Sequence, residues 1–458
     1  MSLRFDGGWA FWQDAAVIED LPTVKDRQMQ ITYPTRPKDR FEVYRFFNGL
    51  ATEGKDGLDR RRSRVPLVKS YLLEHMSPCC GRTLRQPGDI LKSMGAEVQS
   101  VDDTFMEVRD YDSGTGATVP SLRTVGYMEQ LSERFFAYYT CDKSDVATRR
   151  VNHWITRSPD LDSTWFSSQL LQRLWDSDVS QRGDERFSKL TFLHESIFEM
   201  PEDAAEPTGP ESDEEGDEGG PENDSDDQPD FERRKARFNM ADRIGRIKSA
   251  LGNLQANYAP LHALYALRFP SRIGRGSHDL YQQGRITNRS ESFEEHRNIV
   301  HYLYKTYDAM LTHTESTAWR RMESVPTGLR TNIGARGVPL VIQFKEEISA
   351  ATFRHWVSRA FQKRNRFRLW GEPVWMGPTK VHVYGADRHL WQPINIEMTE
   401  KSLIAFLPQG TCGNTFHRLV TNIQAYVCPS IDAWLGGEPF QGLVDSSIAQ
   451  SGGYINEG

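Results

Sequence analysis

The stretch VPLVIQFKEEISAATFRHWVSRAFQKRNRFRLW, residues 338–370, shows the clearest change of periodicity in the chain. Its first residues, Val338–Phe344, predict a strand, whereas the apolar residues of Ala350–Arg364 recur at helical spacing and predict a helix. A closing helix is predicted at Asn414–Tyr426. The segments between these helices with strand composition are Arg366–Trp370, Lys380–Tyr384, Pro393–Met398 and Leu403–Leu407. We therefore predict an α+β unit with a mostly antiparallel sheet over residues 338–445.

The region before this unit has a mainly helical pattern. Pro326–Gly337 has the composition of a breaker and marks a boundary. Residues 233–325 are predicted to be a helical domain, with a strong helix at Ser292–Met322 and a second helix near Leu261–Arg268. The stretch Phe269–Ser290 between them is predicted to be irregular.

The N-terminal region, residues 1–200, is predicted to be mainly α-helical with a few strands. The apolar residues of Val125–Tyr139 lie three or four apart, which indicates one stripe of a helix. Pro66 suits the first turn of another helix that runs to about Met76. Strands are expected at Glu97–Tyr111 and Phe187–Phe198. With 458 residues, the chain is long enough for about three domains, so we expect an α+β multidomain protein.

An acidic tract separates the first two regions. Residues 202–232 contain 15 acidic residues and no Lys or Arg, and they are rich in Pro and Gly. The whole chain has a formal net charge of −7, but outside the tract 48 acidic residues face 56 basic ones, so the rest of the chain is basic with +8. Such a composition cannot bury enough apolar area to order itself. We predict a disordered linker, acting as a solvated spacer or as a polyanion that competes for a basic surface.

The cysteine content and the hydropathy bear on location. The five cysteines are an odd number, no secretory leader is visible, and no apolar run is long enough to cross a bilayer. These features predict a reduced cytoplasmic protein without a membrane segment. No phosphate-binding loop, dinucleotide fingerprint or paired cysteine ligand is present, so no cofactor is expected. A metal site at His382, Asp387 and His389 is considered but not expected.

The loop around Arg272–Asp279 is the first candidate site. Its glycines allow a close backbone approach, and Arg272 and Arg275 offer forked donors for an anion. His278, beside Asp279, is a weak candidate for proton transfer in catalysis. The alternative is a solvated connection whose arginines pair with neighbouring acids.

The turn before the last helix is the second candidate. Gly410, Gly413, Asn414 and Thr415 lie where backbone amides and a helix dipole could bind an anion. The dipole would also lower the pKa of Cys412, which makes that thiol, with His417, a weak catalytic candidate. The alternative is structural, with Asn414 or Thr415 as an ordinary N-cap.

Basic and aromatic residues alternate densely between Arg354 and Trp391, a pattern suited to nucleic acid because cations neutralise phosphates and rings stack on bases. The alternative is that the strands turn these rings into a core. The candidate nucleic-acid contacts are Arg359, Lys363, Arg364, Arg366 and Arg368.

Two classes of function follow. The first is a non-enzymatic binding or scaffold subunit of a larger complex, which contacts a protein, or a nucleic acid, through its basic surface. The second is an enzyme of unfamiliar type that acts on a phosphorylated or anionic substrate. The second requires that Arg275, His278 and Cys412 share one pocket. Because the ionisable groups are scattered along the sequence, we favour the binding function.

Overall fold

The computed structural model describes residues 32–34, 36–52, 66–75, 86–111, 122–179, 183–196, 234–273, 275–327, 330–362 and 365–451, and every structural statement below concerns them. Their helices and strands belong to one of the two units into which the chain divides, Tyr33–Gly458. The predicted acidic linker lies outside the described residues.

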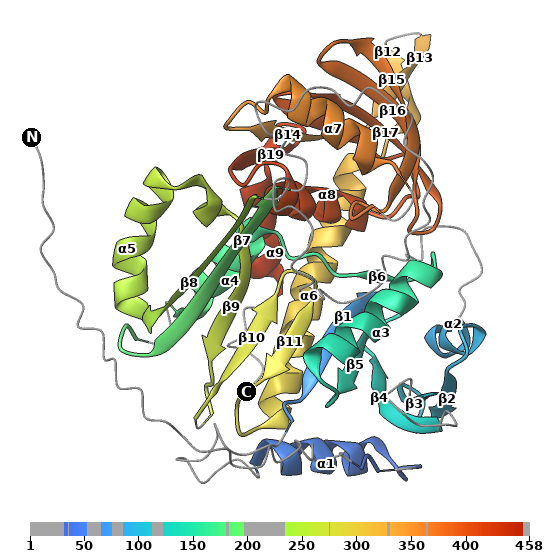
Figure 1. The fold of residues 1–458 in the computed structure, drawn as a ribbon. Helices are drawn as coiled ribbons and strands as arrows, with labels where there is room; N and C mark the ends of the chain where they lie inside the picture. Colours follow the sequence, from blue (N-terminus) through green and yellow to red (C-terminus); the bar gives the residue numbers. More distant parts are fainter. Residues whose placement is uncertain are drawn as a thin grey trace, which may run out of the picture. The chain divides into compact units, whose positions relative to one another are not determined.

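An antiparallel sheet of eleven strands forms the first part of the fold (Figure 1). The spatial order is β2-β3-β4-β5-β1-β11-β10-β9-β7-β8, and β6 pairs with β1. All six residues of β1 are buried, and β1 is paired along both edges. The strand bounds are β1 Lys69–Glu74, β2 Glu97–Ser100, β3 Phe105–Tyr111, β4 Leu122–Gln130, β5 Phe135–Thr140, β6 Asp162–Ser163, β7 Phe187–Ser196, β8 Arg234–Arg243, β9 Leu264–Pro270, β10 Ser277–Tyr281 and β11 Arg285–Asn288.

Helices cover this sheet, and one of them reaches the C-terminal region. The long helix α6 contacts β1 and β11 of the large sheet and also β19 of the C-terminal sheet (Figure 1). Its N-cap is Ser292, whose hydroxyl accepts the amide of Glu295. The bounds are α1 Arg40–Thr52, α2 Pro87–Ser93, α3 Ser144–Arg157, α4 Ser168–Val179, α5 Ile244–Asn257, the short 3-10 helix η2 Ala259–His262, and α6 Phe293–Ala318.

The prediction of a mainly helical N-terminal region was wrong, because strands dominate it. The segment Val125–Tyr139, predicted to be a helix, lies in the hairpin of β4 and β5. The segment from Pro66 to Met76, also predicted to be a helix, contains the strand β1. Both β1 and β5 are buried along their whole length. A strand that is buried on both faces lacks the alternation of apolar and polar residues, so its apolar residues can match helical spacing by chance.

The prediction of a helical middle region was also wrong, because it contains β8, β9, β10 and β11 of the large sheet, although the predicted helix Ser292–Met322 is present as α6. The second predicted helix, Leu261–Arg268, is mostly η2 and β9, and the stretch Phe269–Ser290 that was expected to be irregular holds β10 and β11. These strands are held by pairing with distant ones: β9 with β7, and β11 with β1. Long-range pairing overrode the local pattern. Strands from both sides of the acidic tract therefore share one sheet, and the predicted borders at residues 200 and 233 do not mark its ends.

The C-terminal region contains a seven-stranded antiparallel sheet in the order β15-β16-β17-β18-β14-β19-β20. A separate hairpin of β12 and β13 occupies most of the predicted breaker segment Pro326–Gly337. The strand β15 begins and ends later than predicted, at Leu369–Gly377. The other bounds are β12 Arg321–Thr327, β13 Arg330–Arg336, β14 Leu340–Phe344, α7 Ala350–Ala360, β16 Lys380–Asp387, β17 Gln392–Thr399, β18 Ser402–Phe406, α8 Asn414–Tyr426, β19 Ile431–Leu435, β20 Glu438–Pro439 and α9 Phe440–Gln450.

Helix α8 occupies the centre of the fold. All thirteen of its residues are buried, and it contacts β7 of the large sheet (Figure 1). Burying a charged side chain is costly unless it is paired, so a helix buried on every side needs partners for its charged residues. This requirement gathers ionisable groups around its first turns. Among the described residues, no helix is both long and apolar enough to cross a membrane.

Candidate functional site

The N-terminus of α8 adjoins a buried network of charges. Arg134, in the turn between β4 and β5, donates to Glu74 at the end of β1 and to both carboxylate oxygens of Glu315 on α6. The distances are 2.7 Å from Nε to Glu74 Oε1 and 2.6 Å from Nη2 to Glu315 Oε1. A guanidinium taken out of water requires such forked pairing. Three segments that are far apart in sequence are thereby joined.

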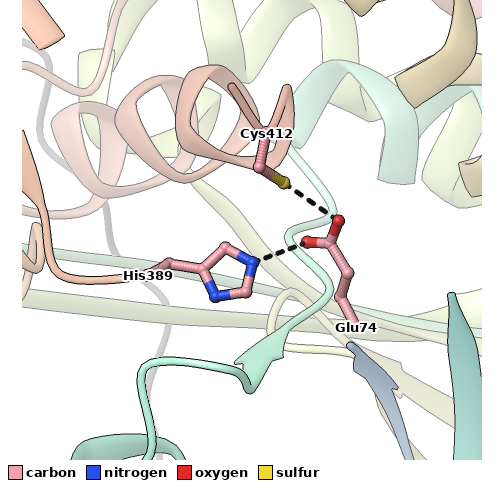
Figure 2. Close-up of side chains that lie close together, drawn as sticks. All are labelled: Glu74, His389 and Cys412. Atoms are coloured by element: carbon pink, nitrogen blue, oxygen red, sulfur yellow. Dashed lines mark hydrogen bonds and ion pairs between the residues drawn. The ribbon is translucent and has the colours of Figure 1, made fainter. Parts of the chain in front are cut away.

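Glu74 also faces two residues of the C-terminal region (Figure 2). The thiol of Cys412 donates to Glu74 Oε1 over 3.0 Å, and His389 Nε2 lies 3.8 Å from Glu74 Oε2. All three side chains are fully buried. Neither Glu74 Oε2 nor His389 Nε2 has a hydrogen-bond partner, which is unusual for buried polar atoms. The donor atoms of the three residues lie within 4.8 Å of one another, so they could hold a metal ion.

A second cluster lies one turn further along α8. Arg418, fully buried, pairs with Asp162 of β6 and with Asp387 at the end of β16, and its Nε donates to the carbonyl of Phe367 over 2.9 Å. Arg368 donates to Asp162 Oδ1 over 3.0 Å. Burial alone would raise the pKa of Asp162, but the two arginines outweigh it and lower that pKa to about 2.

The turn predicted to bind an anion is filled by the chain's own side chains. The amide of Gly413 donates to Glu315 Oε1 over 2.9 Å, and the amide of Cys412 donates to Gln392 Oε1 over 2.6 Å. A Cβ on Gly413 would lie 2.9 Å from Glu315 Cγ, which explains why a glycine stands there. The helix N-terminus that was predicted to attract an anion is present, but its amides are bonded, and Glu315 supplies the negative charge.

The N-cap alternative was wrong. Gly413 is the N-cap and makes no side-chain cap bond. Asn414 instead donates to Asp162 over 3.2 Å and to the carbonyl of Ser163 over 3.0 Å, while Thr415 bonds Asp387. These polar residues were predicted to cap the helix, but their side chains instead bond segments that are distant in the sequence.

The structure does not favour Cys412 as a thiolate nucleophile. Burial, followed by the charges of Glu74 and Glu315, raises the pKa of its thiol well above the ordinary value. Burial also lowers the pKa of His417 to about 3. The His417 ring bonds Thr314 over 3.1 Å, so its side chain is committed elsewhere. Burial raises the pKa of Glu74 to about 7 and lowers that of His389 to about 4.

The structure places the residues of the first predicted loop apart from this network. Arg275 is exposed. Arg272 is exposed as well, and its backbone amide donates to Glu295 over 2.5 Å. His278 is buried, bonds Ser290 over 3.2 Å and stacks on His296 at 5.5 Å between ring centroids.

The predicted nucleic-acid residues have mixed positions. Arg359 is exposed at the end of α7, and Lys363 and Arg364 lie outside the described residues. Arg366 donates to the hydroxyl of Tyr426 over 2.8 Å and lies over its ring, and Arg368 points inward to Asp162. The His382, Asp387 and His389 set is split, because His382 bonds Glu397 while the other two are buried.

The C-terminal sheet carries a group of exposed apolar side chains, unlike the buried charges described above. Large apolar side chains are exposed on adjacent strands, and we call this set the aromatic face: Trp370, Val374, Met376 and Tyr384. Trp370 and Tyr384 are 60% and 69% exposed. Exposed apolar groups gathered on one surface are a common mark of a binding site.

Sequence reasoning missed the residues that complete the buried network: Glu74, Arg134, Asp162, Glu315, Asp387 and Arg418. Asp387 was considered only as a metal ligand. The available signal was a charge inside an apolar run, as at Glu74, which follows Tyr71, Leu72 and Leu73. Such a residue is expensive to bury unless it is paired.

Comparison with known proteins finds similarity over only part of the chain. The family model described as MJECL33-like protein matches residues 273–440. The uncharacterized protein MJECL33 of Methanocaldococcus jannaschii is 27% identical over 146 residues, which cover 32% of this chain and 33% of that protein. The matched region thus spans a third of that relative's length, and no solved structure matches. Residues 273–440 contain Glu315, His389, Cys412 and Arg418, so this chain is similar to MJECL33-like proteins in the part that supplies the C-terminal half of the buried network.

Proposed function

We propose that this chain is a non-enzymatic binding subunit of a larger cytoplasmic complex and that it holds a partner protein on the aromatic face. The observation that carries the proposal is the exposure of Trp370, Val374, Met376 and Tyr384 on the adjacent strands β15 and β16. When a partner protein covers such side chains, their apolar surface leaves water, and this stabilises the complex in proportion to the apolar area covered.

The register of the strands supports a continuous surface. Glu372 of β15 lies opposite Tyr384 of β16, and Trp370 and Val374 are two residues to either side of Glu372. Tyr384 is therefore a diagonal neighbour of both, within reach of their side chains. Aromatic residues at such positions are the usual anchors of protein interfaces.

The charges near this face favour a protein over a nucleic acid. Glu397 pairs with Lys380 over 2.9 Å and with His382 over 2.9 Å, and Glu372 adds a further negative charge. Nucleic-acid binding requires a surplus of cations, whereas here one lysine, Lys380, is outnumbered by two glutamates, Glu372 and Glu397. The inward contacts of Arg366 and Arg368 described above point the same way. The earlier hypothesis of a basic binding surface is thus replaced by an aromatic one.

The partner is expected to cover the face rather than to extend the sheet. β15 is the end strand of its sheet, but Pro373 lies in its middle and lacks an N–H. Proline on an edge strand is a usual device against the addition of another strand.

The enzyme hypothesis receives less support. It required Arg275, His278 and Cys412 in one pocket, whereas Arg275 is exposed, His278 bonds Ser290, and Cys412 bonds Glu74. A catalytic constellation needs these groups to converge on one reacting atom. The acidic linker, as tether or competitor, stays a prediction.

Photo-crosslinking tests the binding function. With p-benzoylphenylalanine in place of Tyr384 in the full chain, irradiation in cells of the source organism is expected to give one discrete protein adduct, because the residue at this position contacts the partner. Phe187 is the matched control position, since it is 66% exposed on another part of the fold and is expected to give no such adduct. Electrophoresis and mass spectrometry identify the products.

A second variant links the adduct to the face. Trp370→Ala combined with Val374→Asp is expected to abolish the adduct and to leave the thermal midpoint nearly unchanged, because exposed positions contribute little to stability. Equal adducts at positions 384 and 187, or no adduct at 384, would refute the proposal. An adduct that is sensitive to nuclease would favour a nucleic-acid partner instead.

A further inference from the structure

We propose that Glu74, His389 and Cys412 bind a zinc ion that joins β1 of the large sheet to the C-terminal region. The three residues come from the end of β1, from the connection between β16 and β17, and from the turn before α8 (Figure 2). Their donor atoms lie within 4.8 Å of one another, and all three side chains are fully buried.

The hydrogen bonds of His389 prepare it as a ligand. Its Nδ1 lies 3.0 Å from the carbonyl oxygen of Pro159. Because a carbonyl only accepts, Nδ1 carries the proton, and Nε2 of the neutral ring is left with a lone pair. Metal-binding histidines usually donate one ring N–H to a carbonyl or carboxylate and bind the metal through the other ring nitrogen. His389 has this arrangement, with Nε2 available for the metal.

The lone pair of His389 Nε2 faces another electron-rich atom. His389 Nε2 lies 3.8 Å from Glu74 Oε2, and neither atom has a hydrogen-bond partner. Two buried acceptors that face each other without a donor repel, whereas a cation between them would satisfy both. Cys412 Sγ completes the set on the other side of the carboxylate, 3.0 Å from Glu74 Oε1.

The chemistry of the three donors selects the metal. A cysteine sulfur, an imidazole nitrogen and a carboxylate oxygen are the three ligand types that zinc uses in proteins. Calcium and magnesium prefer oxygen ligands alone. The contacts around the ligands also hold them in place: Arg134 donates to Glu74 Oε1, and the side chain of Gln392 accepts the amide of Cys412.

The charge balance of the buried network favours a divalent ion. Four carboxylates, Glu74, Asp162, Glu315 and Asp387, contact three guanidinium groups, Arg134, Arg368 and Arg418, which leaves one negative charge. A Cys412 thiolate bound to zinc would add a second. A divalent cation would then bring the network to neutrality, as a buried cluster requires. The three protein ligands leave one of the four positions around a tetrahedral zinc ion to another ligand. Because the three side chains are fully buried, we expect the ion to have a structural role.

Metal analysis of the full-length, tag-free protein purified without chelator tests the proposal. We expect about one zinc per chain, as for a structural site. After unfolding and refolding with cobalt, a thiolate-to-cobalt charge-transfer absorption is expected, because binding is coupled to folding. Refolding with zinc in place of chelator is expected to raise the melting temperature, since the ion binds only the folded chain.

Variants locate the ion. Cys412→Ser and His389→Gln are each expected to lose the zinc and the cobalt absorption. Cys428→Ser is the control, because Cys428 is buried and lies outside the cluster, and it is expected to retain both. Wild-type protein without zinc, cobalt absorption or a zinc-dependent melting temperature would overturn the proposal, and so would full zinc content in Cys412→Ser. If the variants fail to fold, the wild-type measurements decide.

Discussion

Replacing Arg418 by methionine is expected to lower the free energy of unfolding by about 3–5 kcal/mol. The side chain is fully buried on α8 and pairs with both Asp162 and Asp387. Methionine preserves much of the volume but leaves two carboxylates without this partner in a medium of low dielectric constant. Asp162 keeps Arg368, and Asp387 keeps Thr415, so the loss is partial rather than complete. Urea unfolding followed by tryptophan fluorescence measures the change.

Arg173 provides the control for this experiment. It makes a forked ion pair with Asp445, with distances of 2.7 Å, but both side chains are more than two-fifths exposed. The same substitution, Arg173→Met, is expected to cost less than about 1 kcal/mol, because water replaces the lost partner. Equal unfolding midpoints for the two variants would contradict the view that Arg418 holds the centre of the fold.

The C-terminal elements could be predicted because local and tertiary signals agree there. In β17, Gln392–Thr399, buried and exposed residues alternate, which is the pattern of a strand with one face in a core. Helix α7 begins after Ser349, whose hydroxyl accepts the amide of Thr352, as an N-cap predicts. The predicted helix Asn414–Tyr426 has the bounds of α8.

The N-terminal strands could not be predicted because their neighbours are distant in sequence. β1 is buried between β5 and β11, and β11 lies more than two hundred residues after it. No local feature of Lys69–Glu74 reveals that pairing, and its buried faces remove the alternation that would identify a strand.

The candidate site shows the same limit. The turn around Cys412 was predicted to offer unpaired backbone amides, but side chains accept from two of them, and the carboxylate that meets Gly413, Glu315, lies 98 residues earlier in the chain. The bond from Cys412 to Glu74 spans 338 residues. A carboxylate in one segment does not reveal which distant amide or guanidinium it meets, so the network becomes visible only in the folded chain.

Stability is expected to fall steeply as the pH is lowered from 6.5, because two buried histidines stay neutral in the folded protein. Burial lowers the pKa of His296 to about 3, and burial, with a contribution from Arg134, lowers that of His417 to about 3. In the unfolded chain both would take up a proton near pH 6.5. Their contribution is therefore complete above pH 6.5 and is lost as the pH falls toward 3. Each histidine gives a slope of about 1.4 kcal/mol per pH unit, so together they remove about 5 kcal/mol between pH 6.5 and 4.5.

The other shifted groups of the centre do not hide this effect. In the chain without bound zinc, the raised pKa of Glu74, about 7, favours the folded state at lower pH, whereas the lowered pKa of His389, about 4, disfavours it. The two contributions have opposite signs over the same range and nearly cancel. Urea midpoints of protein refolded with chelator, measured at intervals from pH 6.5 to 4.5, give the slope. His296→Gln and His417→Gln are each expected to halve it, because glutamine has no proton to gain, and the double variant is expected to be nearly independent of pH. A wild-type midpoint that stays constant over this range would mean that water reaches these rings and that the centre of the fold is not closed around them.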